Sequence, residues 1–482
     1  MNIKKIAFIE AGTTYFQMLG KFKMPRVGSA LLATMLRDMG YQVRAFVEDI
    51  APVDWQYVRG ADLVCISTLT NTAIRAYAIA SRVRALGIPV VMGGVHPTYM
   101  PSEALEYADY VVRGEGERPL LSLVESLDAG SPPLSGIKGI SYRGPGKKII
   151  HTQKEDLLED IELDALPDPD FRLVHGWKPS YVYPVSTSRG CPFDCNFCSV
   201  VPMFGRKYRF KSVERTLAEL RYIKSIKKGT RFFVDDNFTA NKARSKVLLR
   251  AIIEEGLRDC WVVQARTDVA KDPELIRLMA DAGVHTIYIG FESINPKTLK
   301  KFNKKQELSD IVSSINIIRD NGMHIHGMFI LGADTDDLDT IKKTAGFAAN
   351  SGIETVQIIA LTPLPGTRLF EEIKAQGRLL HTDWSKYNLQ HVVFRPQQMS
   401  PATLQIETIK ANKRFYSWKY ILRSLARFDL HYTAVGLLGR RIMGKTLKQA
   451  VRYTTDYIEN LEAAVPPPLA APALEIEAGN RQ

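Results

Sequence analysis

The chain has 482 residues, of which 45% are hydrophobic and 24% are charged. At roughly 150 residues per domain this length suggests about three domains, and the composition excludes an intrinsically disordered chain. The 64 lysines and arginines exceed the 52 acidic residues and give a net charge of +12, which is compatible with a nucleic acid, an anionic membrane or an acidic substrate as partner. No apolar stretch of about 18 residues predicts a membrane-spanning helix, and the first residues do not resemble a signal peptide, so we expect a cytoplasmic protein.

Residues 1–130 alternate apolar runs with amphipathic segments. This alternation predicts a doubly wound, Rossmann-like α/β domain with a parallel sheet. Ligands of such sheets bind at the loops that follow the strands, which here are Ser67–Asn71 and Gly93–Thr98. The predicted strands are Lys5–Glu10, Gln42–Val47, Asp62–Ile66, Val90–Met92 and Tyr110–Val112, and the predicted helices lie near Leu32–Met39, at Asn71–Leu86 and at Glu117–Leu127.

A second alternating series follows residues 131–180, which are rich in Pro, Gly and Asp and which we interpret as a linker with one hairpin. The second series, residues 181–385, contains six strand–helix units. It predicts a partial (β/α)6 TIM-like barrel, because a complete barrel needs eight units, and it places the chemistry at the carboxyl ends of the strands. The strand candidates are Val182–Ser186, Arg231–Val234, Trp261–Ala265, Thr286–Phe291, His324–Leu331 and Thr355–Leu361.

The C-terminal region is strongly basic. We expect residues 386–465 to be mostly helical and the Pro/Ala-rich residues 466–482 to be disordered. Residues 410–452 contain eleven lysines and arginines and one acid, Asp429, with aromatic side chains between them. One interpretation is a solvated helical face whose apolar stripe packs on the barrel. Another is peripheral contact with an anionic membrane through residues 410–452. No RNA-binding module is visible, so we expect no nucleic acid partner.

Three cysteines, Cys191, Cys195 and Cys198, form a C-x3-C-x2-C run just after the first strand of the barrel. Three thiolates on one short loop can bind three irons of a [4Fe–4S] cluster, which leaves the fourth iron open to a substrate or cofactor. A structural zinc site needs four ligands, and His175, the nearest candidate for the fourth, lies beyond a strand. Cys65 and Cys260 stand alone in strand-like segments and are expected to be core residues.

This cysteine run, with Phe197 before its third cysteine, resembles the signature of the radical S-adenosylmethionine (SAM) superfamily. The resemblance continues in order through Phe233–Phe238, Gln264–Arg266, Gly290–Ser293, Gly327–Gly332 and Thr362–Thr367. It implies that Cys191, Cys195 and Cys198 bind the catalytic cluster and that SAM is held by Asp235, Asp236, Arg266, Glu292, Ser293 and Gly332. Taken alone, Asp235–Asn237 is also typical of a polar, helix-capping turn. Many relatives continue the fifth-strand motif with Pro and Glu, where this chain has Ala333–Asp336.

The first domain resembles the cobalamin-binding domain of the B12-dependent radical SAM class. In that comparison Ser67 and Thr70 face the nucleotide tail of cobalamin, and Gly93 and Gly94 let the backbone approach it. Cobalamin domains that supply a histidine to cobalt carry Asp-x-His-x-x-Gly after the first strand, where this chain has Glu10–Thr14. His96 is a conceivable substitute, although such a residue is more often part of a turn. The alternative is an α/β domain without a cofactor.

The resemblance implies an enzyme that cleaves SAM reductively at its cluster and functionalises an unactivated carbon, with C-methylation through methylcobalamin as the first expectation. Hopanoid and antibiotic C-methylases are one group of relatives; the anaerobic magnesium-protoporphyrin monomethyl ester cyclase is another, and nothing in the sequence separates them. We expect a small-molecule substrate, lipid-like in view of the basic, aromatic C-terminal region, and an electron donor of the flavodoxin or ferredoxin type. A non-catalytic corrinoid or redox sensor is the interpretation from another class.

Overall fold

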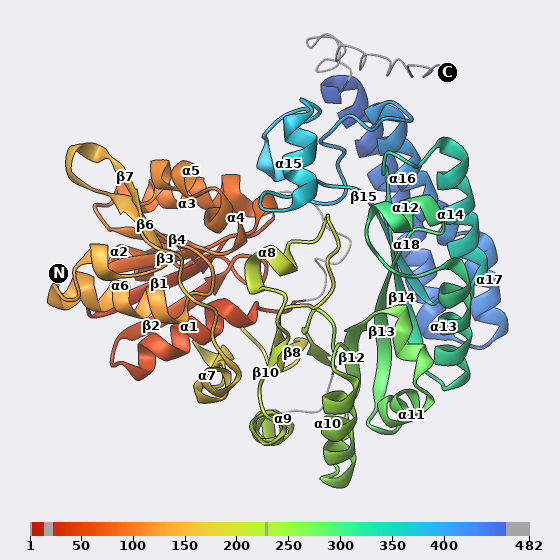
Figure 1. Cartoon of the computed structure of the whole chain (residues 1–482), viewed down its shortest axis with the longest axis horizontal. Coiled ribbons are helices and arrows are strands. Elements are labelled where there is room, and N and C mark those ends of the chain that lie inside the picture. The colour runs from red at the N-terminus through yellow and green to blue at the C-terminus, as the bar shows by residue number, and fades with distance from the viewer. Residues whose placement is uncertain (1, 14–22, 227–229, 459–482) are drawn as a thin grey trace, which may run out of the picture.

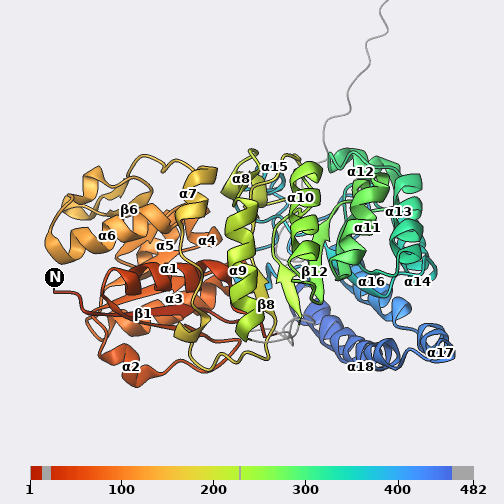
Figure 2. The ribbon, with the colours of Figure 1, turned by 90° about the horizontal axis from the view of Figure 1, so that it is seen from below.

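The computed structural model describes residues 2–13, 23–226 and 230–458 and contains two sheets followed by a helical region. The first sheet and its helices lie at one end of the molecule, and the second sheet lies in the middle. The C-terminal helices cover the far end (Figures 1 and 2). The predicted tail, residues 466–482, and the end of the predicted helical region, residues 459–465, lie outside the described residues.

The first sheet has seven strands in the order β2-β1-β3-β4-β5-β6-β7. Strands β1 to β5 are parallel, as predicted, and their side chains are buried on both faces because helices cover the sheet on either side. Its strands are β1 Lys5–Glu10, β2 Gln42–Val47, β3 Leu63–Ser67, β4 Val90–Gly93, β5 Tyr110–Val112, β6 Ile140–Arg143 and β7 Ile149–His151. Its helices are α1 Val27–Asp38, α2 Trp55–Arg59, α3 Ala73–Arg84, α4 Val95–Tyr99, α5 Pro101–Tyr107 and α6 Glu117–Ala129.

The segment between the sheets contains the hairpin that the sequence predicts. Strands β6 and β7 are antiparallel and extend the first sheet beyond β5. After them the chain forms the short helix α7, Asp160–Ala165, and crosses to the second sheet. The hairpin half of residues 131–180 is therefore part of the first sheet, and the second half connects the first sheet to the second.

The second sheet has six parallel strands in the order β15-β14-β13-β12-β11-β8. Its edge strands do not pair with each other within the described residues, so the sheet is the predicted partial barrel. Its strands are β8 Tyr183–Val185, β11 Arg231–Phe233, β12 Trp261–Ala265, β13 Val284–Glu292, β14 His324–Leu331 and β15 Thr355–Ala360. Its helices are α8 Val200–Phe204, α9 Val213–Ile226, α10 Lys242–Glu254, α11 Pro273–Asp281, α12 Pro296–Lys301, α13 Leu308–Asp320, α14 Leu338–Asn350 and α15 Arg368–Ala375. A short antiparallel pair, β9 Ser188–Arg189 and β10 Arg209–Phe210, follows β8.

Three helices, α16 Pro401–Phe415, α17 Trp418–Ala426 and α18 Leu430–Tyr453, cover the edge at β15. The Asn412 side chain of α16 donates to Ile358 O at 2.7 Å and accepts from Ile358 N at 3.2 Å, so it satisfies backbone groups that an edge strand would otherwise leave unpaired. The C-terminal helices are thus integral to the second sheet. Within the described residues, no helix is both long and apolar enough to cross a membrane.

Candidate active site

The cysteine run forms a loop between β9 and α8 at the carboxyl end of the second sheet. Burial raises the pKa of the Cys191 thiol and raises the pKa of Cys198 to about 12, with the neighbouring thiols and Asp236 acting in the same direction. Such crowded thiolates need the positive charge of a metal centre. In the described ranges, no three His, Cys, Asp or Glu side chains converge on one point that a single metal ion could fill. A [4Fe–4S] cluster takes one thiolate per iron, so three cysteines on one short loop are a donor set for three of its irons.

Side chains from distant parts of the barrel hold the cysteine loop. The Arg266 guanidinium, after β12, lies 3.8 Å from the centre of the Phe193 ring. The Asp194 carbonyl accepts from Asn303 at 2.9 Å and from Arg368 at 2.8 Å. Further contacts come from Leu369 N to Asn196 O at 3.1 Å and from the rings of Phe197 and Phe302, whose centres lie 4.9 Å apart. The loop is therefore shaped by protein contacts on both sides of the cysteines.

Asp235, at the carboxyl end of β11, is fully buried below this loop. Its carboxylate accepts from Thr187 N at 2.7 Å, Thr187 Oγ1 at 2.5 Å and Ser188 N at 2.9 Å. Arg244 donates to Thr187 Oγ1 at 3.1 Å and so adds a positive charge next to the carboxylate. Asp235 thus fixes the start of the cysteine loop, and both carboxylate oxygens already have protein partners.

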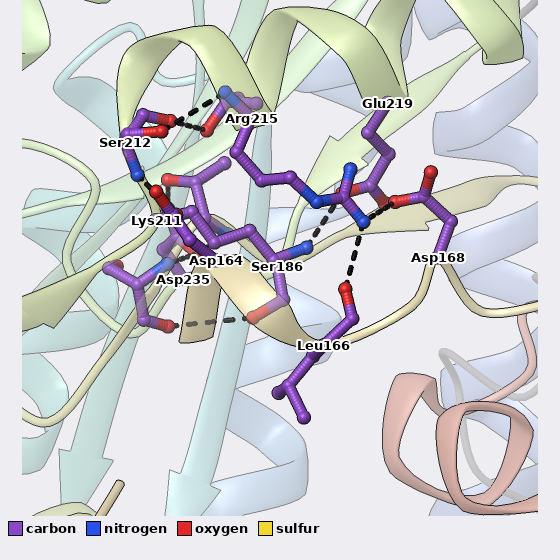
Figure 3. Close-up of polar contacts among 12 residues, drawn as sticks. Asp164, Leu166, Asp168, Ser186, Lys211, Ser212, Arg215, Glu219 and Asp235 are labelled. Atoms are coloured by element: carbon purple, nitrogen blue, oxygen red, sulfur yellow. Dashed lines mark hydrogen bonds and ion pairs between the residues drawn. The ribbon is translucent and has the colours of Figure 1, made fainter. Parts of the chain in front are cut away.

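The crossing segment supports the same region from outside (Figure 3). Arg215 of α9 donates to Leu166 O at 3.0 Å and to Asp168 at 2.6 Å, and Asp164 accepts from Ser212 N at 2.7 Å (Figure 3). A buried ion pair, Lys211 Nζ to Glu219 Oε2 at 2.8 Å, lies alongside. Because the backbone N–H of Lys211 donates to Thr187 O, this network reaches the residues that Asp235 holds.

Glu292 ends β13 in a left-handed conformation, with φ of 62°. Its carboxylate pairs with Lys304 at 2.7 Å, and both side chains are about nine-tenths buried. A side chain on Gly290 would lie 2.2 Å from Glu292 Oε1, so the glycine leaves the room that this pair occupies. Arg266 donates to the Lys304 carbonyl, which joins this pair to the residue that contacts Phe193. Lys304 is not apparent from the sequence, because it comes twelve residues after Glu292 in a loop.

Ser293 and Gly332 lie at the carboxyl ends of the neighbouring strands β13 and β14. Ser293 Oγ accepts from Asn295 N at 3.0 Å. Gly332 has φ of +100°, and a Cβ there would lie 2.3 Å from Leu404 of α16. In Ala333–Asp336, where the sequence differs from many relatives, the Asp336 carboxylate accepts from the backbone N–H groups of Gly332 and Ala333. Asp334 pairs with Lys301 at 2.7 Å. Both acids therefore have protein partners.

A cavity of about 330 Å³ lies between the two sheets, at the carboxyl ends of β3, β4 and β5 and against β9 and α8. Ser67, Gly93 and Gly94 line it, whereas Thr70 is buried in the turn Thr70–Thr72 and does not. Asp236 also lines the cavity. Desolvation by the surrounding protein, together with the nearby Asp235 charge, raises the pKa of Asp236 to about 7, although the side chain opens to the cavity. The inner wall is apolar and lined by Phe8, Leu32, Val91, Val112 and Leu120. A glycine-bordered apolar cavity fits a flat nucleotide base.

None of the described residues that line the cavity is a histidine. His96 is fully buried beneath it and pairs with Tyr77 OH at 3.0 Å, so it does not face the cavity. Glu10, which ends β1, is buried and pairs with the partly exposed Arg26 at 3.1 Å. Thr14, the last residue of the segment Glu10–Thr14, lies outside the described residues. His175 packs on Phe46, away from the cysteine loop.

A buried ionic cluster joins the first sheet to the β9–β10 pair at this cavity. Glu115, after β5, accepts from Arg209 of β10 at 2.8 and 3.0 Å and pairs with Arg189 of β9 at 3.1 Å, while Arg189 also pairs with Glu117 at 2.5 Å. Arg209 further donates to Phe204 O and Leu158 O. These residues were not predicted from the sequence. Glu115 and Glu117, which alternate with two glycines directly after a parallel strand, were the available signal.

The close approach at Gly94 allows a test of the first sheet. At Gly94, φ is +102° and a Cβ would lie 2.5 Å from Thr68 O. We expect Gly94→Ala to destabilise the protein by about 1–3 kcal/mol more than the matched Gly87→Ala, because overpacking adds to the backbone strain. Gly87 shares a positive φ of +77° but has nothing within 4 Å. Urea unfolding followed by circular dichroism measures the difference; equal losses from the two variants would contradict the close approach.

Comparison with known families and structures agrees with this geometry. The family model of the "Radical SAM superfamily" matches residues 185–348, and that of the "B12 binding domain" matches residues 20–124. The first match covers the cysteine loop and most of the second sheet. The second covers the strands that border the cavity.

Relatives span most of the chain. An uncharacterised methyltransferase of Pyrococcus horikoshii is 32% identical over 81% of this chain and 88% of its own length. Bacteriochlorophyllide d C-12(1)-methyltransferase of Chlorobaculum tepidum is 30% identical over 80% of each chain. Anaerobic magnesium-protoporphyrin IX monomethyl ester cyclase of Cereibacter sphaeroides is 29% identical over 73% of this chain and 58% of its own.

Solved structures share the fold. The radical SAM methyltransferase TsrM of Kitasatospora setae, with cobalamin and a [4Fe–4S] cluster bound, has a TM-score of 0.65 at 18% identity and covers 78% of both chains. The cobalamin-dependent radical enzyme OxsB, with aqua-cobalamin bound, has a TM-score of 0.69 at 15% identity over 95% of this chain and 75% of its own.

Sheet order, cysteine loop and family matches together define a radical SAM enzyme. Within that superfamily the chain belongs to the family that carries an N-terminal cobalamin-binding domain. Its cofactors are a [4Fe–4S] cluster, SAM and cobalamin, and its relatives favour methyl transfer. None of these comparisons favours a non-catalytic sensor.

Proposed function

We propose that the protein transfers a methyl group to an unactivated carbon of a small apolar molecule. The observation that carries this proposal is the cavity between the two sheets, where the loops of the cobalamin-binding domain face β9 and α8, the elements that flank the cysteine loop in the chain. A group held there lies at the carboxyl edge of the barrel, where a substrate also binds. The relative from Chlorobaculum tepidum is named for the carbon position that receives its methyl group, C-12(1).

When bound, the cluster supplies one electron to cleave SAM and cobalamin supplies a transferable methyl group. We propose that Cys191, Cys195 and Cys198 bind the cluster and that the protein holds SAM above it through Asp236, Arg266, Glu292, Ser293 and Gly332. Asp235 acts in this proposal by positioning the loop, since its carboxylate is occupied by Thr187 and Ser188. Ser67, Gly93 and Gly94 border the cobalamin, with Thr70 supporting their turn.

Arg266 and the Glu292–Lys304 pair have linked roles in this proposal. Arg266 contacts Phe193 of the cysteine loop and the Lys304 carbonyl, and Lys304 neutralises the buried Glu292 carboxylate. An ammonium group of SAM can replace or join Lys304 at that carboxylate, because both are hydrogen-bond donors of the same charge. Glu292 would therefore hold the ammonium of SAM, and Arg266 would keep this position close to the cysteine loop.

The substrate class, the electron donor and the membrane contact complete the proposal. We propose a lipid-like or other apolar small molecule, consistent with the apolar inner wall of the cavity and the aromatic C-terminal region. We propose a flavodoxin or ferredoxin as one-electron donor, and peripheral contact of residues 410–452 with a membrane surface. The second candidate reaction is oxidative ring closure, which the 29% identity to the cyclase supports.

An extract comparison separates these reactions. The protein is purified anaerobically with hydroxocobalamin, and lipid and porphyrin extracts of strains that carry the wild-type gene, the Cys195→Ala gene or no gene are compared by mass spectrometry. We expect one product heavier by a methylene unit, labelled when the cells receive methionine with a deuterated methyl group, in the wild-type strain alone. A product that has lost hydrogens and gained no label would assign the cyclase reaction and overturn the proposal.

A further inference from the structure

The turn between α17 and α18 exposes an unusual concentration of apolar side chains. Phe428 is 91% exposed, Leu430 72% and Leu422 61%. With Trp418, Leu425 and Leu437 they form what we call the tip surface, which lies at the end of the molecule away from the first sheet (Figures 1 and 2). Other large exposed apolar side chains, such as Ile161 and Val247, are scattered over different elements. Six exposed apolar side chains gathered on two consecutive helices and the turn between them mark an interaction surface.

The fold does not need this patch for its own core. The opposite face of α17 carries the buried side chains, Tyr420 and Ile421, and Tyr420 OH donates to Glu354 O at 2.6 Å. Trp418, Leu422 and Leu425 repeat at helical spacing on the other face and point away from the barrel. Phe428 adopts φ of +57°, a conformation that glycine or asparagine takes at lower cost after a helix. Packing within the chain therefore gives no reason for an aromatic residue there.

Positive charge surrounds the tip surface. Between residues 410 and 452 eleven basic residues face one acid. On the exposed side of α18 the sequence passes from Leu430 and Leu437 near the turn to Arg441, Lys445 and Lys448 farther along. Arg440 lies 5.1 Å from the Trp418 ring, at the boundary between the two zones. An apolar end followed by a basic zone matches the order of layers in an anionic bilayer, with acyl chains inside and phosphates at the surface.

A second cavity, of about 260 Å³, opens beside the tip at the amino-terminal ends of β14 and β15. Arg319, Arg423 and Arg427 line it together with two acids. Both acids are engaged: Glu354 accepts from Ile325 N at 2.8 Å and Asp429 caps α18 through Tyr432 N at 3.0 Å. Arg423 and Arg427 form no ion pair within residues 2–13, 23–226 and 230–458. The cavity therefore offers two arginines to a phosphate group.

We propose that the tip surface inserts into the surface of an anionic bilayer and that the arginine cavity binds the phosphate of one lipid headgroup. This inference deepens the proposed peripheral contact of residues 410–452 and does not depend on the reaction. Apolar insertion and basic attraction each contribute, so neither supplies the affinity alone. The surface lies at the amino-terminal ends of the barrel strands and so leaves the cysteine loop, at the opposite ends, accessible.

Vesicle sedimentation of the full, reconstituted protein tests the proposal. Vesicles of phosphatidylcholine alone are compared with vesicles that contain phosphatidylglycerol, for the wild type and for the triple variant Leu425→Ser/Phe428→Ser/Leu430→Ser. We expect binding to anionic vesicles at least about 25-fold tighter than to neutral ones, and a loss of about tenfold or more in the triple variant. The control variant Ile161→Ser/Val247→Ser removes exposed apolar side chains elsewhere, 81% and 52% exposed, and is expected to bind like the wild type.

The charge contribution has its own variant. Arg423→Gln/Arg427→Gln is expected to weaken binding to anionic vesicles about 25-fold, since each basic residue near the surface contributes about fivefold, and to leave weak binding to neutral vesicles unchanged. Equal wild-type binding to both vesicles, or an unaffected triple variant, overturns the proposal. Dimerisation of the wild type without vesicles, abolished in the triple variant, would assign the surface to a second copy and also overturn it. Formation of 5′-deoxyadenosine in the absence of vesicles measures SAM cleavage independently of membrane binding.

Discussion

Replacing Cys195 by alanine is expected to abolish the cluster and SAM cleavage together. The three cysteines lie on one loop, and no other described His or Cys side chain joins them around a metal position. Loss of an outer-shell partner of a metal ligand already costs 10–100-fold, so loss of a ligand is expected to lower 5′-deoxyadenosine formation by more than about 100-fold. Iron and sulfide content, visible absorbance and 5′-deoxyadenosine with dithionite and SAM measure the effect under anoxic conditions.

The control for this prediction is Cys260→Ala. Cys260 is half-buried before β12, at the amino-terminal end of the barrel strand, and is remote from the loop. Its replacement removes a thiol without touching the site, so four irons per chain and SAM cleavage should remain. A Cys195→Ala protein that retains a SAM-cleaving cluster, or a wild-type protein that binds zinc instead, would contradict the assignment.

Removing the Glu115 carboxylate is expected to give the largest loss of stability. Arg209 is 1% exposed, and Glu115 accepts two hydrogen bonds from it and one from Leu158 N at 2.9 Å. Glu115→Ala leaves the Arg209 charge buried without its partner, which costs about 3–5 kcal/mol. Because Arg189 and Arg209 both pair with Glu115 from the β9–β10 pair, the loss should also loosen the cavity beside them and weaken cobalamin retention.

A double variant separates charge from packing. Glu115→Ala/Arg209→Met removes both buried charges and is expected to recover a large part of the loss, as buried pairs replaced by apolar residues often do. Urea unfolding measures stability, and cobalamin absorbance after gel filtration measures retention. A loss below about 1 kcal/mol for Glu115→Ala, or a double variant less stable than the single one, would contradict a buried ionic connection between the first sheet and the β9–β10 pair.

Much of the fold was predictable because parallel strands covered by helices on both faces appear in the sequence as apolar runs. Five strands, among them β1 and β14, have the predicted bounds. The three cysteines and the acids after β11 and β13 were predictable for a related reason, since polar residues at strand ends stand out from those runs. The hairpin of β6 and β7 was predicted, but its addition to the first sheet was not, because nothing local specifies which sheet edge a hairpin joins.

The partners of the site residues could not be predicted. Asp235 binds Thr187, 48 residues earlier, and Glu115 binds Arg209, 94 residues later. The first contact is fixed by the pairing of β8 with β11, and the second by how the first sheet meets the β9–β10 pair. Periodicity contains no information about either arrangement. The orientation of Thr70 could not be predicted either. Three residues after β3 the chain turns inward, so Thr70 is buried while Ser67 and Thr68 line the cavity.

The anchoring of the cysteine loop by Arg368 has a consequence for maturation of the enzyme. Arg368 binds Asp194 across 174 positions of the chain, and Leu369 binds Asn196 beside it. The loop therefore acquires its shape only after the last strand of the barrel has been synthesised and packed. Iron and sulfide delivered to a nascent chain would meet three unorganised thiols, so cluster insertion is a late step, and the scaffold must already be built when the cofactor arrives.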